Sequence, residues 1–284
     1  MTTPIDASGT FTFKGTEVHR LGYGSMQLPG PGVWGPSADP ANAVAVLRRA
    51  VELGVDFIDT ADSYGPSIAE ELIAEALHPY GQVKIATKAG LTRQGPGKWL
   101  PVGRPEYLRQ QCELSLRTLK VDALDLFQLH RVDAKVPAAE QFGLLAELLE
   151  EGKVKAIGLS EVDVATIEEA RGIVEISTVQ NLYNLSNRSS EAVLDYCERE
   201  GIGFIPWFPV ASGKLAEPGG LLDDLAHETG ATHAQLAIAW LLARSEVMLP
   251  IPGTASLEHL AENCEAASIQ LSEAQLTALS GAVA

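Results

Sequence analysis

Eight short apolar runs alternate with helical patterns along this chain, and this alternation limits the folds that the chain can adopt. The runs are rich in Val, Ile, Leu and Phe, as expected of strands buried on both faces of a parallel sheet. They are Leu21–Met26, Asp56–Asp59, Val83–Thr87, Ala123–His130, Ala156–Ser160, Thr178–Asn181, Gly203–Trp207 and Val247–Ile251. Strands that alternate with helices predict an α/β fold, and eight repeats of this unit predict a (β/α)₈ TIM barrel.

Amphipathic stretches lie between the runs and carry apolar residues at spacings of three and four. We expect helices over Pro40–Leu53, Pro105–Leu119, Ala138–Glu151, Ser189–Glu200, Ala234–Arg244 and Ser256–Ala267. Caps or first-turn prolines mark helix starts at Pro40, Pro105, Asp163 and Ser256. Two features lie outside the repeat: residues Phe11–Val18 predict an N-terminal β-hairpin, and Ala274–Ala282 predict an extra C-terminal helix. No linker or low-complexity segment interrupts the series, so we interpret residues 1–284 as a single domain.

The composition disfavours several classes of function. The net charge of −16 argues against binding to nucleic acid or to an anionic membrane surface. Three cysteines without a Cys-x-x-Cys pair argue against a disulfide framework or a zinc site. The first residues lack the basic and apolar regions of a signal peptide, and no apolar stretch is as long as a membrane span. We therefore expect a cytoplasmic protein, monomeric or weakly oligomeric, that acts on a small molecule.

Four side chains suited to proton transfer follow neighbouring runs. Asp59 ends the second run and Tyr64 comes five residues later, Lys88 follows the third run, and His130 ends the fourth. The carboxyl ends of barrel strands meet at one rim, so we expect these side chains to share a pocket. A tyrosine has an unperturbed pKa of about 10, and a nearby ammonium lowers this value. Lys88 can supply that ammonium, with Asp59 holding it charged, and His130 can bind the same carbonyl oxygen as Tyr64.

Each of these residues also has a structural interpretation. An aspartate after a strand often caps a turn, a lysine at a rim is usually solvated, and a histidine at a strand end is often structural. Lys88 is also compatible with a Schiff-base lyase or aldolase, in which a lysine is the nucleophile. An ion pair with Asp59 argues against that chemistry, because it keeps the amine protonated. A nucleotide-binding auxiliary subunit with little turnover is a further alternative.

The residues at the ends of the runs resemble those of the aldo-keto reductase family. The resemblance covers nearly the whole chain and rests on an ordered set of motifs: Leu21-Gly22-Tyr23-Gly24, Asp59 through Tyr64, Thr87-Lys88, Leu129-His130, Gly158-Leu159-Ser160, Val179-Gln180, Trp207-Phe208-Pro209 and Pro252-Gly253-Thr254 through Glu262-Asn263. It implies an NAD(P)H-dependent oxidoreductase that reduces aldehydes or ketones without a metal, with Tyr64 as the general acid. The stretches Leu21–Leu28 and Gly30–Pro36 resemble the bacterial branch that reduces pyridoxal.

The resemblance also implies how the cofactor binds. Ser160 and Gln180 would hold the nicotinamide carboxamide, with Glu161 beside them, and Trp207 would stack on the ring. The chain has no G-x-G-x-x-G of a Rossmann site, so we expect the phosphates after the last two runs and at a helix N-terminus. The other candidate cofactor residues are Ser212, Lys214, Gly253, Thr254, Ser256, His259, Glu262 and Asn263.

Two departures from the family pattern affect the cofactor. Glu161 stands where the family commonly has asparagine, and a carboxylate accepts hydrogen bonds but cannot donate them. If it points inward, its charge would favour the cationic oxidised ring; if it points outward, it would leave the ring unaffected. Gly253 and His259 stand where many members have Lys and Arg, which weakens the clamp for a 2′-phosphate. NADP(H) remains the expected cofactor, and NAD(H) is the alternative.

Aromatic residues in the rim loops predict the substrate pocket. Met26, Trp34 and Trp99 are the candidate walls. Two long loops rich in Gly and Pro, Thr92–Gly103 and Ala211–Gly220, are expected to border the pocket. Walls of this kind suit planar or aromatic carbonyl compounds.

Overall fold

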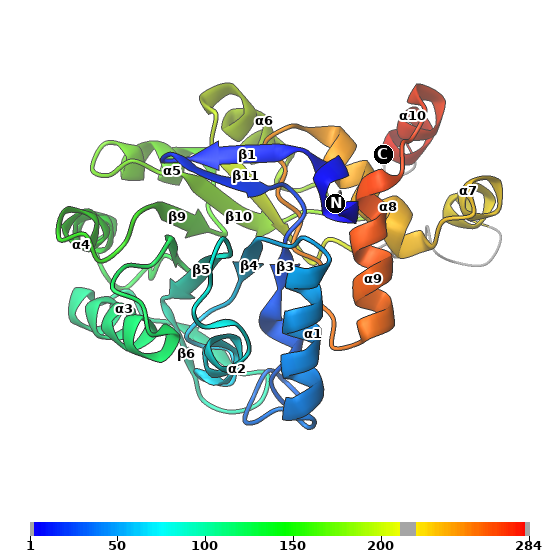
Figure 1. Cartoon of the computed structure of the whole chain (residues 1–284). Coiled ribbons are helices and arrows are strands. Elements are labelled where there is room, and N and C mark those ends of the chain that lie inside the picture. The colour runs from blue at the N-terminus through cyan, green and yellow to red at the C-terminus, as the bar shows by residue number, and fades with distance from the viewer. Residues whose placement is uncertain (1–2, 211–219, 282–284) are drawn as a thin grey trace.

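The apolar runs pair side by side as parallel strands in the computed structural model, which describes residues 3–210 and 220–281 (Figure 1). Within these residues, seven strands follow the order β11-β10-β9-β8-β5-β4-β3 and curl into a (β/α)₈ barrel. The strands are β3 (Tyr23–Gly24), β4 (Phe57–Asp59), β5 (Lys84–Ala89), β8 (Leu126–Leu129), β9 (Ile157–Ser160), β10 (Thr178–Leu182) and β11 (Gly203–Trp207).

The eighth predicted strand, Val247–Ile251, is interrupted in the structure. Met248 makes a β-bridge with Phe204 of β11, but Pro250 and the following Pro252 have no N–H to donate to a ladder. The carbonyl oxygens of these two prolines still accept hydrogen bonds from the backbone N–H groups of Gly22, next to β3, and Gly24, in β3, at 2.9 and 3.5 Å. This segment therefore joins β11 to β3 and closes the barrel.

Two glycines allow that closure. A Cβ on Gly24 would lie 2.7 Å from the carbonyl oxygen of Ile251, and a Cβ on Gly253 would lie 2.6 Å from the carbonyl oxygen of Gly24. The crowding atoms belong to the backbone and cannot move aside, so a side chain at either position would force the two segments apart.

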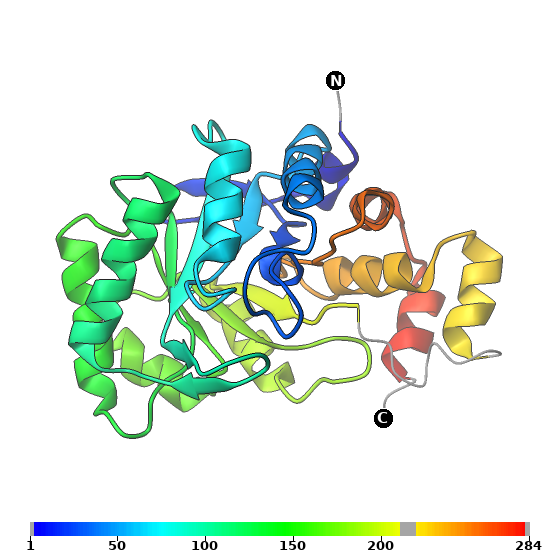
Figure 2. The ribbon, with the colours of Figure 1, turned by 90° about the horizontal axis from the view of Figure 1, so that it is seen from below.

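Helices surround the strands, and the first six form a series in which each of the first five packs beside the next (Figures 1 and 2). The predicted helix starts are confirmed: Pro40 and Pro105 occupy first turns, and the side chains of Asp163 and Ser256 accept hydrogen bonds from backbone N–H groups three residues later. The helices are α1 (Pro40–Glu52), α2 (Ile68–Leu77), α3 (Pro105–Leu119), α4 (Ala138–Glu150), α5 (Val164–Arg171), α6 (Glu191–Glu200), α7 (Leu221–Thr229), α8 (His233–Arg244), α9 (Leu257–Glu265) and α10 (Glu273–Gly281). None of these helices, which lie in the described residues, is long and apolar enough to cross a bilayer.

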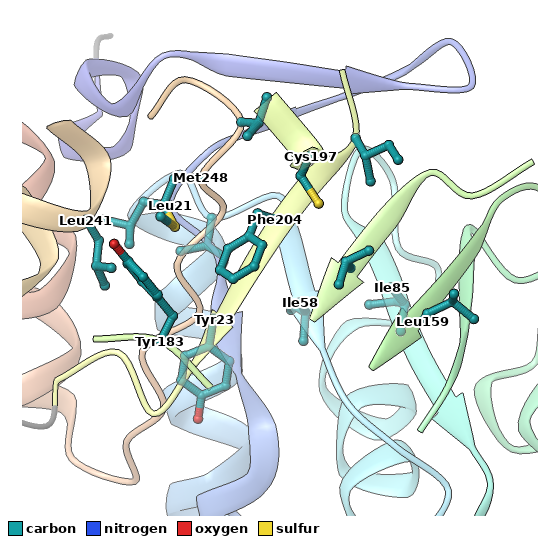
Figure 3. Close-up of a cluster of buried hydrophobic side chains, with 14 of the residues drawn as sticks. Leu21, Tyr23, Ile58, Ile85, Leu159, Tyr183, Cys197, Phe204, Leu241 and Met248 are labelled. Carbon is teal, nitrogen blue, oxygen red and sulfur yellow. The ribbon is translucent and has the colours of Figure 1, made fainter. Parts of the chain in front are cut away.

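The apolar core has two large parts, one inside the barrel and one around it, and a third small cluster of Ala61, Tyr64 and Ala69. The predicted N-terminal hairpin, β1 (Thr10–Phe13) with β2 (Thr16–His19), buries Phe13 and Val18 against barrel residues such as Phe57. Residues from successive strands, with helix residues such as Leu241, form the outer core (Figure 3). Because the hairpin covers one end of the barrel, the open end is the one at which the strands terminate.

The loop Thr92–Gly103 contains an unpredicted second hairpin, of β6 (Leu91–Arg93) with β7 (Trp99–Pro101). Its strands pair antiparallel, so this stretch is more ordered than its Gly and Pro content suggests. Ser212 and Lys214, in the second predicted rim loop, lie outside the described residues.

Candidate active site

Asp59, Tyr64, Lys88 and His130 meet at the carboxyl ends of β4, β5 and β8. The Lys88 Nζ donates to Asp59 Oδ2 at 2.5 Å, and it lies 3.4 Å from the Tyr64 hydroxyl oxygen. The rings of Tyr64 and His130 are 6.0 Å apart, edge to face. Lys88 is fully buried and is not among the described residues that line the cavity, whereas Asp59, 2% exposed, reaches the cavity lining.

The second oxygen of Asp59 is held by two glutamines. Gln180 donates to Asp59 Oδ1 at 2.8 Å and Gln128 donates to the same atom at 3.3 Å. Gln128 comes from β8, two strands from β4 in the sheet, and Gln180 comes from β10, four strands away, so the curl of the sheet brings Gln180 near Asp59. Gln128 was not predicted, although it lies two residues before His130 and so faces the same side of its strand.

Burial and charge together set the protonation of this cluster. Burial opposes the charge on Lys88, but Asp59 and Tyr64 outweigh it and raise the pKa of this ammonium above its ordinary value. Burial raises the pKa of Tyr64 above the ordinary 10.0, and Lys88 offsets this only in part. Lys88 lowers the pKa of Tyr64 as the sequence predicts, but burial, which the sequence analysis did not consider, outweighs it. Burial, followed by the charge of Lys88 and of nearby arginines, holds the pKa of His130 well below its ordinary value.

Tyr64 and His130 line a cavity of about 700 Å³ at the open end of the barrel. Two of the predicted walls, Met26 and Trp99, line it as well. The Trp99 ring packs edge-on against Tyr64, with centroids 6.3 Å apart. Apolar walls around a few convergent polar groups are typical of a site for a small molecule.

Trp34, the third predicted wall, is not among the described residues that line the cavity, and Arg93 explains why. The Arg93 guanidinium lies 3.5 Å from the centre of the Trp99 ring and 5.7 Å from that of the Trp34 ring, so it contacts both. It also donates to the carbonyl oxygens of Gly32 and Ser63, at 2.7 and 2.8 Å. Arg93, which like Trp34 is not among the described residues that line the cavity, thus links three loops behind the Trp99 wall. Nothing in the sequence pattern singled out this residue.

Ser160 and Gln180 line the same cavity and are direct partners in the register of β9 and β10. The Ser160 hydroxyl accepts from Arg131 at 3.0 Å, which leaves its own proton for another acceptor. The Gln180 amide nitrogen is engaged with Asp59, which leaves its carbonyl oxygen to accept. One donor beside one acceptor matches a primary carboxamide, so these residues fit a nicotinamide. Arg131, which also lines the cavity, was not predicted.

Glu161 points along the rim and is not among the described residues that line the cavity. Its Oε1 accepts from the backbone N–H of Leu182 at 2.7 Å and from the indole N–H of Trp207 at 2.6 Å. Trp207 itself lines the cavity. Of the two orientations considered from the sequence, the structure shows the outward one. It differs from the expectation in one respect: the outward carboxylate still contacts the indole N–H of Trp207, the ring expected to stack on the nicotinamide.

The remaining predicted cofactor residues gather around the start of α9. Gly253 lines the cavity, Thr254 is buried, and the Ser256 side chain caps the helix by accepting from the His259 N–H at 3.3 Å. The other two, on α9 itself, are the half-buried Glu262 and the buried Asn263. The N–H groups at this helix end therefore lie close to the cavity, where they suit an anionic group.

A model of the aldo/keto reductase family matches residues 20–284. The chain belongs to this family. The aldo/keto reductases are oxidoreductases, so the family and the barrel predicted from the sequence are both confirmed.

Two relatives of this aldo/keto reductase are similar over nearly its full length. An uncharacterized oxidoreductase of Schizosaccharomyces pombe is 50% identical over 270 residues, which are 94% of this chain and 88% of that protein. Pyridoxine 4-dehydrogenase of Escherichia coli is 44% identical over 282 residues, which are 97% of this chain and 98% of that protein.

Solved aldo-keto reductases share the fold. A thermostable member in complex with the inhibitor epalrestat superimposes with a TM-score of 0.84 at 29% identity, covering 95% of this chain and 98% of that one. A member from Klebsiella pneumoniae in complex with NADPH gives a TM-score of 0.80 at 29% identity, covering 95% of this chain and 93% of that one.

Proposed function

We propose that this aldo/keto reductase reduces aldehydes or ketones to alcohols, with Tyr64 as the general acid and NADPH as the hydride donor. The observation that carries the proposal is the buried Lys88–Asp59 pair, whose ammonium lies 3.4 Å from a tyrosine hydroxyl at a cavity wall. The same pair argues against a Schiff-base lyase, because Asp59 holds Lys88 protonated and the amine is fully buried.

Asp59, Tyr64, Lys88 and His130 have separate roles in proton transfer. When bound, the reduced nicotinamide supplies the hydride to the carbonyl carbon. Tyr64 gives its proton to the carbonyl oxygen, and a ring N–H of the neutral His130 donates to the same oxygen and orients the substrate. Lys88 stabilises the phenolate that remains on Tyr64, and Asp59 keeps Lys88 charged and in place.

Three observations support the cofactor and substrate that we propose. A solved relative binds NADPH, and another Klebsiella pneumoniae structure contains NADP. Ser160 and Gln180 offer one donor and one acceptor to a carboxamide. A relative at 44% identity is a pyridoxine 4-dehydrogenase, so we propose a flat aromatic aldehyde such as pyridoxal as substrate. NAD(H) stays the alternative cofactor, because Gly253 and His259 replace the cations of many members.

The direct test is fluorescence titration with NADPH and NADH, followed by a panel of carbonyl compounds that includes pyridoxal. We expect NADPH to bind more tightly than NADH and aromatic aldehydes to be consumed with oxidation of the cofactor. If neither dinucleotide binds, the proposed function is wrong. We further propose a monomer or weak oligomer in the cytoplasm, a reducing compartment that suits three buried free cysteines.

The reduction should respond to pH through Tyr64. Because burial raises the pKa of this phenol above 10.0, the protonated donor persists through neutral and mildly alkaline solution. We therefore expect kcat/KM for reduction to be constant from neutral to mildly alkaline pH and to fall only above the pKa of Tyr64. The rate of alcohol oxidation, which needs the phenolate, should rise with pH. Initial rates in both directions across a pH series would measure this. A fall in reduction near neutral pH would contradict it.

Arg93→Lys should loosen the pocket wall. Lysine cannot reproduce the planar stacking on Trp99 or the several hydrogen bonds to carbonyl oxygens, so we expect KM for the aldehyde to rise about tenfold while kcat changes little. Steady-state kinetics at saturating NADPH would measure both constants. Arg104→Lys is the control, since Arg104 is exposed and pairs with Glu106. Equal KM values for the two variants would show that the wall does not depend on Arg93.

A further inference from the structure

Glu161 has an unusual backbone conformation for its residue type. Its φ is +55°, in the left-handed region that Gly, Asn and Asp adopt more readily than glutamate. It directly follows Ser160, the last residue of β9. A glutamate in this backbone conformation costs free energy, so we expect its side chain to make compensating interactions near Ser160.

The Glu161 side chain connects three neighbouring strands at the rim. Starting from the end of β9, its Oε1 accepts from the Leu182 N–H of β10 and from the Trp207 indole N–H of β11. An indole nitrogen can only donate, so Trp207 depends on such an acceptor for its orientation. Hydrogen bonds to a carboxylate are about twice as strong as those between neutral groups. Glu161 therefore holds the plane of Trp207 at the cavity.

The same contact places a negative charge at the edge of the Trp207 ring. The oxidised nicotinamide ring carries a positive charge and the reduced ring is neutral, so a nearby carboxylate attracts only the oxidised form. Arg131 is the opposing charge at this rim: it donates to Ser160 and interacts electrostatically with Glu161. Neutralising Glu161 would leave the Arg131 charge uncompensated, which again disfavours the oxidised ring.

We propose that Glu161 is a cofactor-positioning residue that aligns Trp207 and biases the site towards the oxidised dinucleotide. This inference rests on the proposed function, because it assumes that the nicotinamide lies against Trp207. It adds to that function a determinant of the equilibrium between the bound complexes. A site that stabilises the oxidised cofactor shifts them towards oxidised cofactor and alcohol, and it slows release of the oxidised cofactor after reduction.

Glu161→Gln separates charge from hydrogen bonding, because the amide oxygen can still accept while the charge is lost. We expect Kd for NADP⁺ to rise about fivefold and Kd for NADPH to change less than twofold, as a single charge across a few ångströms of partly solvated rim predicts. Quenching of tryptophan fluorescence would measure both constants. Glu168→Gln is the matched control, an exposed carboxylate on α5 that should change neither constant.

Glu161→Met removes the acceptor as well as the charge. We expect it to weaken NADPH binding too, but not in a Trp207→Phe background, where no indole N–H remains to be held. A double-mutant cycle on Kd for NADPH measures this coupling. Additive effects in the cycle, or equal changes of both Kd values in Glu161→Gln, would overturn the proposal while leaving the proposed function intact. Failure of the unsubstituted protein to bind either dinucleotide would overturn both.

Discussion

Tyr64→Phe should lower kcat for carbonyl reduction about 10³-fold while leaving Kd for NADPH within about twofold, since general acid catalysis contributes on that scale. The substitution removes one hydroxyl from the cavity wall and keeps the ring that packs against Trp99 and His130. The proton donor is lost, whereas the residues around Ser160 and Gln180 are untouched.

Steady-state kinetics and fluorescence titration on the same preparation would separate the two effects. Tyr107→Phe is the matched control, because Tyr107 lies on α3 and is not among the described residues that line the cavity. Retention of most activity in Tyr64→Phe would remove Tyr64 from the acid role. Loss of NADPH binding together with activity would instead indicate a structural role.

Lys88→Met should impair both catalysis and stability. It leaves the buried Asp59 carboxylate without its cation, and breaking a buried pair in this way costs about 3–5 kcal/mol of unfolding free energy. It also removes the ammonium that stabilises the Tyr64 phenolate, so kcat should fall about 10²-fold or more. Denaturant unfolding and kinetics would measure the two losses.

The double variant Asp59→Asn/Lys88→Met distinguishes the causes. With both charges removed, no unpaired carboxylate remains, so we expect much of the stability to return. Activity should not return, because the ammonium is still absent. Recovery of activity with stability would mean that Lys88 acts only through the fold.

Predictions from the sequence succeeded where the signal is local and periodic. The strand ends at Asp59 and Ser160 and the helix starts at Pro40 and Asp163 follow from apolar runs, capping residues and proline. The short helices α2 and α7 were not predicted, although α2 is framed by clear neighbouring elements. The eighth strand was predicted as continuous, but the structure interrupts it, because Pro250 and the following Pro252 lack the N–H groups that a strand donates to its neighbours.

The site residues that the sequence did not predict were missed for a different reason. Arg93 acts through carbonyl oxygens of loops far from it in sequence, and Arg131 acts through Ser160 of the next strand. Such contacts carry no spacing signal, since they depend on how aperiodic loops fold over the rim. The net pKa of Tyr64 was missed for a similar reason. The lowering effect of Lys88 follows from the motif, but the larger effect of burial depends on atoms from many parts of the chain.

The sequence by itself determined the order of elements, the family and which side chains stand at the carboxyl ends of the strands, because hydrophobic periodicity and turn chemistry act over a few residues. Only the tertiary structure decided that Glu161 turns outward to Trp207, that Trp34 contacts Arg93, and that burial keeps the Tyr64 phenol protonated. These outcomes depend on distances and dielectric surroundings that exist only once the barrel has closed.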